Sequence, residues 1–169
     1  KFGALADHLL KEKVVKNFFI PKECSIDTMK TSHSLEYINQ IKNKTLDIKS
    51  QKKIGFPIND SVVRRSFVAT GGTVLASKLA LDSKLACNTA GGSHHATFDY
   101  GAGYCVFNDV AVAANYLKNK GYAKKILIID LDVHQGNGNS EIFKNDKNVL
   151  TFSMHCASNY PAKKIKERY

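Results

Sequence analysis

The chain has 169 residues, which suits a single domain, and 43% of them are hydrophobic, which supplies a core and argues against wholesale disorder. Its 25 basic and 15 acidic residues give a formal net charge of +10. The lysines are scattered in ones and twos and form no basic stripe interleaved with aromatic residues. We therefore expect no direct binding of nucleic acid.

The four cysteines are widely spaced and include no Cys-x-x-Cys pair, which is the pattern of neither a disulfide framework nor a cysteine zinc site. This usage fits a reducing compartment, so we expect a cytoplasmic protein. The sequence shows no signal peptide and no apolar run long enough to span a bilayer, so we expect no membrane association. Because the chain begins at Lys1 rather than at a methionine, we expect its true amino terminus to be missing.

Helices and polar loops are predicted for the first part of the chain. Leucine and valine recur at helical spacing over residues 1–20, and a proline follows, which predicts a helix. A shorter helix is predicted over residues 34–41, with Ser32 or Ser34 as its cap. Residues 42–59 are polar and lysine-rich and end in Gly-Phe-Pro, which predicts a loop.

A long helical segment follows this loop and extends to about Leu81, with Asn59 or Asp60 as its cap. It contains the pair Gly71-Gly72, although glycine destabilises the interior of a helix. We predict that the two glycines allow close packing against another backbone, which is a structural rather than a catalytic role.

The remainder of the chain alternates between predicted strands and helices, which favours an α/β fold with a mostly parallel sheet. In order, we predict a strand at 85–90, a glycine-rich loop at 91–95, a loop at 96–105, a helix at 108–119, a strand at 126–129, a short helix at 141–144 and a strand at 149–154. The charged residues 163–169 contain no recognisable closing element.

The most informative stretch begins at the apolar, β-branched run 126–129, which predicts a strand buried on both faces. Asp130, Asp132 and His134 then alternate with apolar residues, and two glycines follow. Because side chains on a strand alternate between its faces, we expect the two carboxylates and the imidazole to point the same way.

Unpaired charge is costly to bury, so we expect a cation among these groups. Asp132 and His134 offer oxygen and nitrogen ligands that suit Zn²⁺, Fe²⁺ or another divalent first-row metal. The carboxyl end of a parallel strand is also where open α/β sheets bind their ligands. The alternative is a solvated strand end with ordinary surface charges.

His94 and His95 follow Gly-Gly on a predicted loop, where both side chains can line one cavity. A single histidine is more often a core or surface residue than a functional one. Two adjacent histidines upstream of an Asp-x-Asp-x-His segment favour a catalytic role.

Three motifs, in this order, resemble the histone deacetylase family, and within it the bacterial and class IV-like branch. They are Gly91-Gly92-Ser93-His94-His95-Ala96, then Gly101-Ala102-Gly103-Tyr104-Cys105-Val106-Phe107-Asn108-Asp109, then Asp130-Leu131-Asp132-Val133-His134-Gln135-Gly136-Asn137-Gly138. The resemblance covers nearly the whole chain. It implies an arginase/deacetylase-like fold with three layers, in which helices flank a mostly parallel sheet.

The resemblance also implies roles for individual residues. Asp132 and His134 match two ligands of the catalytic zinc, His94 and His95 match the paired general acid/base histidines, and Asp130 matches the carboxylate that orients His94. A nearby monovalent cation, K⁺, is expected to be held by Asp130, Asp132, His134, Ser153 and the carbonyl of Met154. Gly103, Tyr104 and Tyr160 are similar to residues that form the channel for the acyl-lysine side chain, although each tyrosine could instead be a half-buried structural residue.

Two positions depart from the pattern of many family members. Asn137 stands behind His95 where an aspartate is frequent, and a neutral amide stabilises an imidazolium less than a carboxylate does. Gln135 replaces a second histidine after His134, as is typical of the class IV-like branch.

The family supplies a further zinc-binding aspartate and an oxyanion-stabilising tyrosine from a carboxyl-terminal half that this chain does not contain. We therefore expect residues 1–169 to be the amino-terminal portion of a single deacetylase domain, incomplete at its carboxyl-terminal side and weak in zinc binding. The expected function is zinc-dependent removal of acetyl or acyl groups from lysine or a related amine. The alternatives are a catalytically inactive remnant or interaction module, and an arginase-like hydrolase with two metals.

Overall fold

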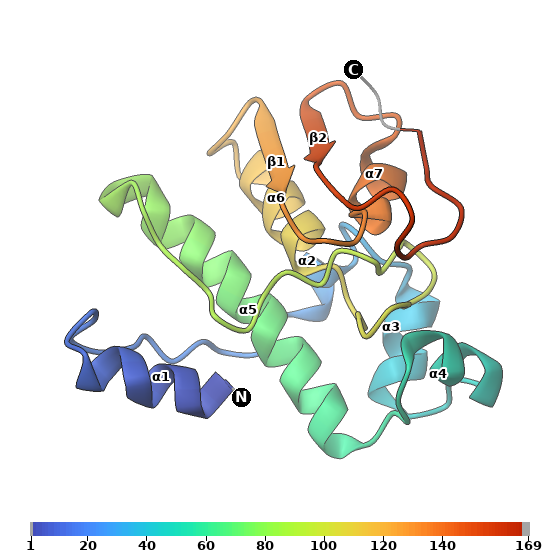
Figure 1. The fold of residues 1–169 in the computed structure, drawn as a ribbon, viewed down its shortest axis with the longest axis horizontal. Helices are drawn as coiled ribbons and strands as arrows, with labels where there is room; N and C mark the ends of the chain where they lie inside the picture. The colour runs from blue at the N-terminus through green and yellow to red at the C-terminus, as the bar shows by residue number, and fades with distance from the viewer. Residues whose placement is uncertain (1, 167–169) are drawn as a thin grey trace.

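Helix α5 (Asp60–Ser83) runs through the middle of the molecule and packs most extensively against α6 (Asp109–Asn119) (Figure 1). The computed structural model describes residues 2–166, so predictions for residue 1 and for residues 167–169 lie outside the described part. The remaining elements are α1 (Phe2–Lys11), α2 (Ile26–Met29), α3 (Leu35–Lys42), α4 (Ile48–Ile54), β1 (Ile126–Asp130), α7 (Asn137–Phe143) and β2 (Val149–Ser153).

Side-chain caps begin the helices where the sequence predicted them. Ser34 accepts a hydrogen bond from the third residue of α3, Asn59 caps α5 and Asn108 caps α6 in the same way. Each side-chain oxygen satisfies a backbone N–H that has no partner within its helix. The predicted helices over 34–41, 60–81 and 108–119 are therefore confirmed to within about two residues.

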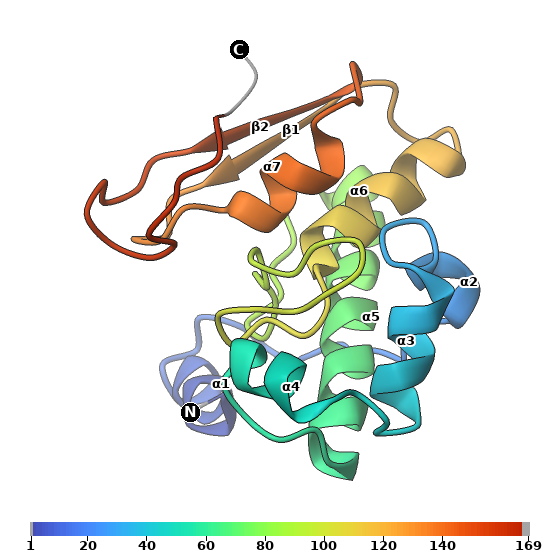
Figure 2. The ribbon, with the colours of Figure 1, turned by 90° about the vertical axis from the view of Figure 1, so that its right-hand side faces the viewer.

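The strands β1 and β2 pair in parallel, from Ile126 opposite Val149 to Asp130 opposite Ser153. The predicted parallel pairing is confirmed, and within residues 2–166 these two strands form the sheet. Helices α6 and α7 both lie on one side of it (Figure 2). The inward side chains of the strands pack there against apolar residues of α6 and α7, in a core made of Ala111, Ala114, Ile128, Phe143 and Val149.

The outer face of the sheet is apolar and exposed, so the prediction of a strand buried on both faces is wrong. Leu127 and Ile129 are 55% and 59% exposed, and their register partners Leu150 and Phe152 are also exposed. Among the described residues no helix covers this face (Figure 2). The continuous apolar run does reflect two apolar faces, but only one of them is buried here.

Two predictions in the amino-terminal part are wrong. The first helix ends at Lys11 rather than at residue 20, because Lys13 takes a left-handed conformation (φ 56°) that a helix does not continue through. The predicted loop 42–59 contains helix α4. Asp47 caps this helix, and Gly55 ends it at φ 109°, a conformation that favours glycine.

Two later predictions also need correction. Residues 85–90 form no strand, because Asn88 instead bonds to helix α5 through the carbonyl of Ala69 and the hydroxyl of Thr73. Helix α7 begins at Asn137, four residues before the predicted start. This earlier start brings Asn137 and Gly138 onto the first turn of a helix.

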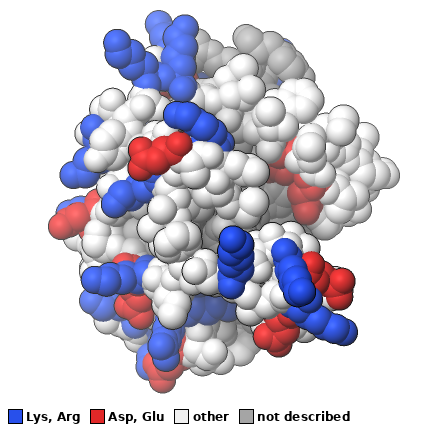
Figure 3. Space-filling view, turned by 90° about the vertical axis from the view of Figure 1, so that its left-hand side faces the viewer, with Lys and Arg blue, Asp and Glu red and all other residues white. Residues whose placement is uncertain are grey.

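Basic and acidic side chains are mixed on one face of the molecule. On the face that Figure 3 shows, groups of lysine and arginine side chains have acidic side chains beside them. Within residues 2–166, no helix has the length and apolar character needed to cross a bilayer.

The glycine pair in α5 packs tightly, and the predicted contact with another backbone is confirmed for Gly71, whereas Gly72 lies against a side chain. A Cβ atom on Gly71 would collide with the backbone carbonyl oxygen of Lys22, and one on Gly72 would meet the Asn88 side chain. The segment that precedes α2 therefore lies directly against the helix, and Cys24 N–H donates to the carbonyl of Phe67 at 3.0 Å.

We predict that Gly71→Ala lowers the free energy of unfolding by roughly 1–3 kcal/mol, because the new methyl group forces two backbones apart. This loss exceeds the gain of about 1 kcal/mol in helix propensity. Urea denaturation measures the difference. Gly3→Ala, in α1 with nothing within 4 Å of the added Cβ, is the control and should not destabilise the chain. Equal stability of the Gly71→Ala variant and the unmodified protein would contradict the packing argument.

Candidate active site

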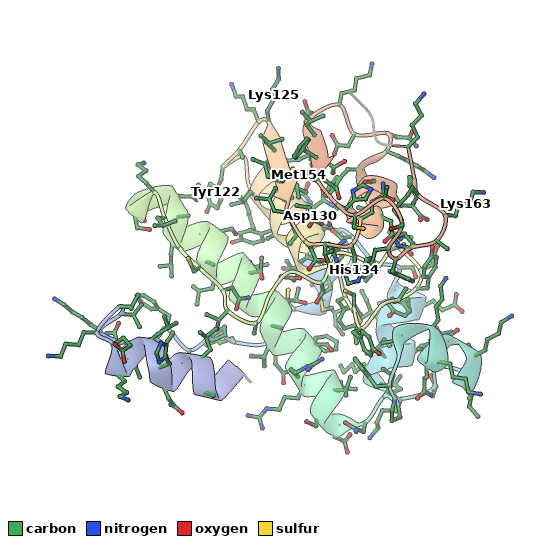
Figure 4. All side chains as sticks on the ribbon, in the orientation of Figure 1. Tyr122, Lys125, Asp130, His134, Met154 and Lys163 are labelled. Atoms are coloured by element: carbon green, nitrogen blue, oxygen red, sulfur yellow. The ribbon has the colours of Figure 1, made fainter. Side chains whose placement is uncertain are left out.

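The acidic and imidazole groups gather at the carboxyl end of β1. Asp130 is the last residue of that strand, so the prediction that Asp132 and His134 also lie on the strand is wrong. The chain bends instead, and each carboxylate accepts a bond from the backbone N–H two residues ahead: Asp132 N–H to Asp130 Oδ1 at 3.1 Å, and His134 N–H to Asp132 Oδ1 at 2.7 Å. Figure 4 shows Asp130 and His134 near one end of β1 and Lys125 at the other.

The adjacent histidines come to the same place from a distant segment, residues 91–97, here called the histidine loop. His94 Nδ1 lies 2.5 Å from Asp130 Oδ2, and both side chains are about nine-tenths buried. A carboxylate only accepts hydrogen bonds, so Nδ1 carries the proton and Nε2 faces away from Asp130. His94 Nε2 lies 3.8 Å from Asp132 Oδ1, which connects the histidine loop to the acidic segment.

His95 forms a second pair, with a neutral partner. Its Nδ1 lies 2.7 Å from Asn137 Oδ1, so Nδ1 carries the proton and Nε2 has a free lone pair. Burial lowers the pKa of His95, and the hydrogen bond to Asn137 offsets only part of this effect. The imidazole is therefore neutral at neutral pH, the state that a general base requires.

Asp132 and His134 form the most accessible part of the site. His134 Nδ1 lies 3.0 Å from Asp132 Oδ1, and the side chains of His134 and Asp132 are 37% and 51% exposed. Burial tends to raise the pKa of Asp132, but the His134 backbone N–H and the neighbouring imidazoles hold it below its usual value. An anionic carboxylate beside an imidazole fits a divalent first-row metal as two of its ligands.

These two residues do not complete a metal site by themselves. Among residues 2–166, no group of three or more histidine, cysteine, aspartate or glutamate side chains is arranged to hold a metal ion. A catalytic zinc has three protein ligands as a rule. The described residues therefore offer a partial ligand set that is open on its exposed side.

Of the three predicted channel residues, two lie against the imidazoles. The Tyr160 ring meets the His95 ring edge-on at 4.8 Å, and a Cβ atom on Gly103 would lie 2.5 Å from His95 Cδ2. Tyr104 has a positive φ of 66°, and its exposed ring lies over Gly55. Tyr104 therefore packs on the turn that ends α4, and its role in the channel stays a prediction.

The residues predicted for a monovalent cation lie at the end of the sheet. The Ser153 hydroxyl accepts from Gly136 N–H at 3.2 Å and lies 2.9 Å from His155 Nδ1. Met154 N–H donates to the carbonyl oxygen of Asp130 at 3.0 Å. These contacts bring Ser153 and Met154 beside Asp130, and their role as cation ligands stays a prediction.

A buried carboxylate that the sequence reasoning missed holds the histidine loop in place. Asp109 accepts hydrogen bonds from Gly92 N–H at 3.1 Å and Ser93 N–H at 2.7 Å, and from the hydroxyl of Thr73. It is the first residue of α6, where the helix dipole also favours a negative charge. Asp109 therefore fixes the backbone immediately before His94.

Asn108 and Gly138 join the histidine loop to α7. Besides capping α6, Asn108 donates from Nδ2 to the carbonyl of Ala96 at 3.1 Å and to Asn139 Oδ1 at 2.8 Å. Gly138 N–H donates to the carbonyl of His94 at 2.9 Å, and a Cβ atom on Gly138 would collide with that oxygen. Gly138 in the third motif is the sequence feature that could have predicted this contact, because glycine permits two backbones to approach closely.

Comparison with known proteins gives consistent matches. The profile of the histone deacetylase domain matches residues 1–169. The chain is 43% identical over 166 residues to an uncharacterised protein of Picosynechococcus sp., an alignment that covers 97% of this chain and 55% of that protein. It is 30% identical over 171 residues to histone deacetylase 2 of Arabidopsis thaliana, covering 93% of this chain and 41% of that protein.

A solved structure is similar in fold. The crystal structure of an HDAC homolog from Aquifex aeolicus matches with a TM-score of 0.77 and 30% sequence identity, over 85% of this chain and 41% of that chain. This likeness confirms the predicted arginase/deacetylase-like fold class. The chain spans about half the length of the relatives it matches, or less.

His33 bonds to Asn108, one of the residues that hold the histidine loop, and its contribution to stability can be measured. It is buried, and its Nε2 accepts the backbone N–H of Asn108 at 2.9 Å. Burial lowers the pKa of His33 from 6.5 to about 4. Because the unfolded chain binds this proton more readily, the contribution of His33 to stability is fully present above pH 6.5 and falls as the pH drops toward 4.

We predict that stability declines between pH 6.5 and pH 4 by up to about 3 kcal/mol from this residue, since each pKa unit corresponds to about 1.4 kcal/mol. Urea unfolding over this pH range in His33→Gln, which does not titrate but retains an acceptor for Asn108, should show a shallower decline. An unchanged pH dependence in that variant would show that His33 is not the responsible group.

Proposed function

The chain belongs to the histone deacetylase family, and from this premise we propose that it supplies the acid/base half of a zinc-dependent deacetylase. The proposed reaction is hydrolysis of the amide bond in an acetylated or acylated lysine or a related amine. The observation that supports the proposal is that side chains from two distant segments lie together. Two imidazoles from the histidine loop meet Asp132 and His134 from the segment after β1, at the exposed end of that strand.

Asp132 and His134 would hold the divalent cation, proposed as Zn²⁺ with Fe²⁺ as the alternative. When bound, such a cation polarises the amide carbonyl and makes water more acidic. His95 is placed to remove a proton from that water through Nε2, because Asn137 occupies Nδ1 and burial keeps the ring neutral. The proton is afterwards returned to the departing amine by an imidazole.

His94 is proposed to act with its charged partner. The Asp130 carboxylate at 2.5 Å fixes the tautomer with the proton on Nδ1, so His94 Nε2 is directed toward the segment that carries Asp132. Asp130 also connects this pair to the proposed K⁺ site, because Met154 N–H bonds to its backbone carbonyl. A cation there would fix the end of β1, and with it the direction of the Asp130 side chain.

Substrate binding is proposed to use Gly103, Tyr104 and Tyr160. The Tyr160 ring and the backbone of Gly103 both lie against the His95 ring, and Tyr104 follows Gly103 in the sequence. Aromatic walls suit the four-carbon stem of lysine, which carries its polar group at one end. This arrangement supports a narrow channel that delivers the acyl group to His95.

We predict that His95→Ala lowers kcat/KM for an acetyl-lysine peptide by about 10²- to 10⁴-fold, because the general base is lost. The assay measures free amine released by the complete enzyme that contains these residues, in the presence of added Zn²⁺. His8→Ala, an exposed histidine in α1, is the control and should leave turnover unchanged. Hydrolysis by His95→Ala at the unmodified rate would refute the base assignment.

A Zn²⁺ titration followed by NMR separates an enzyme from an inactive remnant. We expect Zn²⁺ to shift the imidazole signals of His134, at weak affinity because the described residues offer two ligands, and the shift to disappear in Asp132→Asn. A His134 shift together with peptide hydrolysis supports the enzyme. Absence of both supports the alternative function, a remnant or interaction module that retains the fold.

A further inference from the structure

Tyr160 lies on an irregular segment, residues 156–165, here called the channel loop. The loop contains no helix or strand, and most of its residues are exposed. Lys164 Nζ donates to the carbonyls of Asn159 and Pro161, but these bonds lie within the loop and do not attach it to the rest of the protein. An exposed loop with few buried contacts is mobile unless other bonds hold it. The position of Tyr160 therefore depends on the few contacts that attach the loop to the rest of the protein.

Both ends are held by the segment that follows β1. At the start of the loop, Cys156 N–H donates to the carbonyl of Val133 at 2.9 Å. At its far end, the buried side chain of Gln135 bonds twice to one residue: Nε2 donates to the carbonyl of Ile165 at 2.7 Å, and Oε1 accepts the N–H of Ile165 at 2.9 Å. The Gln135 backbone N–H also points to the carbonyl of Tyr160 at 3.4 Å.

We propose that Gln135 is a positioning residue for the substrate channel, and that its amide holds the channel loop so that the Tyr160 ring stays against His95. Gln135 is adjacent in sequence to His134, whose ring lies 5.8 Å from His95. The same short segment therefore carries one proposed metal ligand and fixes one wall of the channel. The proposal rests on the proposed function only for what Tyr160 does to substrate.

The chemistry of the amide suits this task. The donor and the acceptor of a glutamine amide project from one carbon atom, side by side, so they match the N–H and C=O of a single extended residue. A neutral imidazole also has one donor and one acceptor, but they lie on different edges of the ring and diverge. A histidine at position 135 would therefore satisfy at most one of the two groups of Ile165.

The test uses a spectroscopic reporter on the metal-free chain. The sequence contains no tryptophan, so Tyr160→Trp introduces a single tryptophan beside His95, which can be excited selectively over the remaining tyrosines. In this background we expect Gln135→Met, which retains the volume but loses both hydrogen bonds, to shift the emission to longer wavelength and to increase acrylamide quenching by about twofold or more. Gln135→Glu retains the acceptor for Ile165 N–H and should give an intermediate effect.

Amide hydrogen exchange supplies a second measurement, in the protein without the tryptophan. We expect Gln135→Met to accelerate exchange at Ile165 by about tenfold, in line with the loss of one hydrogen bond. Amides of the β1–β2 ladder should exchange at unchanged rates. Neither measurement requires turnover, so a failed deacetylase assay leaves this result interpretable.

Gln51 provides a matched control. Its amide also makes two bonds to backbone, donating to the carbonyl of Leu46 at 2.7 Å and accepting from Ile58 N–H at 2.9 Å, but it does so around helix α4. Gln51→Met should therefore leave the emission of the introduced tryptophan and the Ile165 exchange rate unchanged. The proposal is overturned if Gln135→Met alters neither signal, or if Gln51→Met alters both to the same extent.

Discussion

The contact between the histidine loop and the first turn of α7 organises the site. Gly138 N–H bonds to the carbonyl of His94, and the absence of a side chain at Gly138 lets the two backbones approach. Asn108 closes the same junction from the other side, because it bonds both to Ala96 and to Asn139. Since Asn137 lies on this first turn, the approach also sets the 2.7 Å distance between Asn137 and His95. A shift of either backbone would separate the imidazole from its partner.

The two histidines are chemically distinct although they are neighbours in sequence. His94 faces a carboxylate, whereas His95 faces an amide. The amide of Asn137 offsets only part of the effect of burial, which lowers the pKa of His95. The centroids of the two rings lie 4.1 Å apart, so a positive charge on His94 would disfavour protonation of His95. The two adjacent rings therefore differ in their partners and in their surroundings, and His95 is the ring whose pKa burial lowers.

Local features of the sequence predicted much of this structure. The caps Ser34, Asn59 and Asn108 and the apolar run of β1 act within a few residues, so pattern alone located their elements. Helix α4 was missed although Asp47 and Gly55, its cap and its terminator, were visible in the sequence. The predicted site residues do converge, but the links made by Asp109 and by the side chain of Asn108 join segments far apart in sequence. Spacing does not reveal such links, because they depend on how the elements pack.

Exposed apolar side chains continue from the outer face of the sheet into the segment that carries the proposed metal ligands. Leu131 and Val133 are exposed and alternate along the chain with Asp132 and His134, directly after the exposed positions of β1. A polypeptide layer that covered this surface would bury the apolar sheet face. Beside Asp132 and His134 it would need to offer a further ligand, if this pair binds a metal as proposed. Because Asp132 and His134 are neighbours of Leu131 and Val133 in the sequence, a polypeptide that packed on these two apolar residues would come near the proposed metal ligands. Burial of the outer sheet face and access to the proposed metal ligands would therefore depend on each other through this one segment.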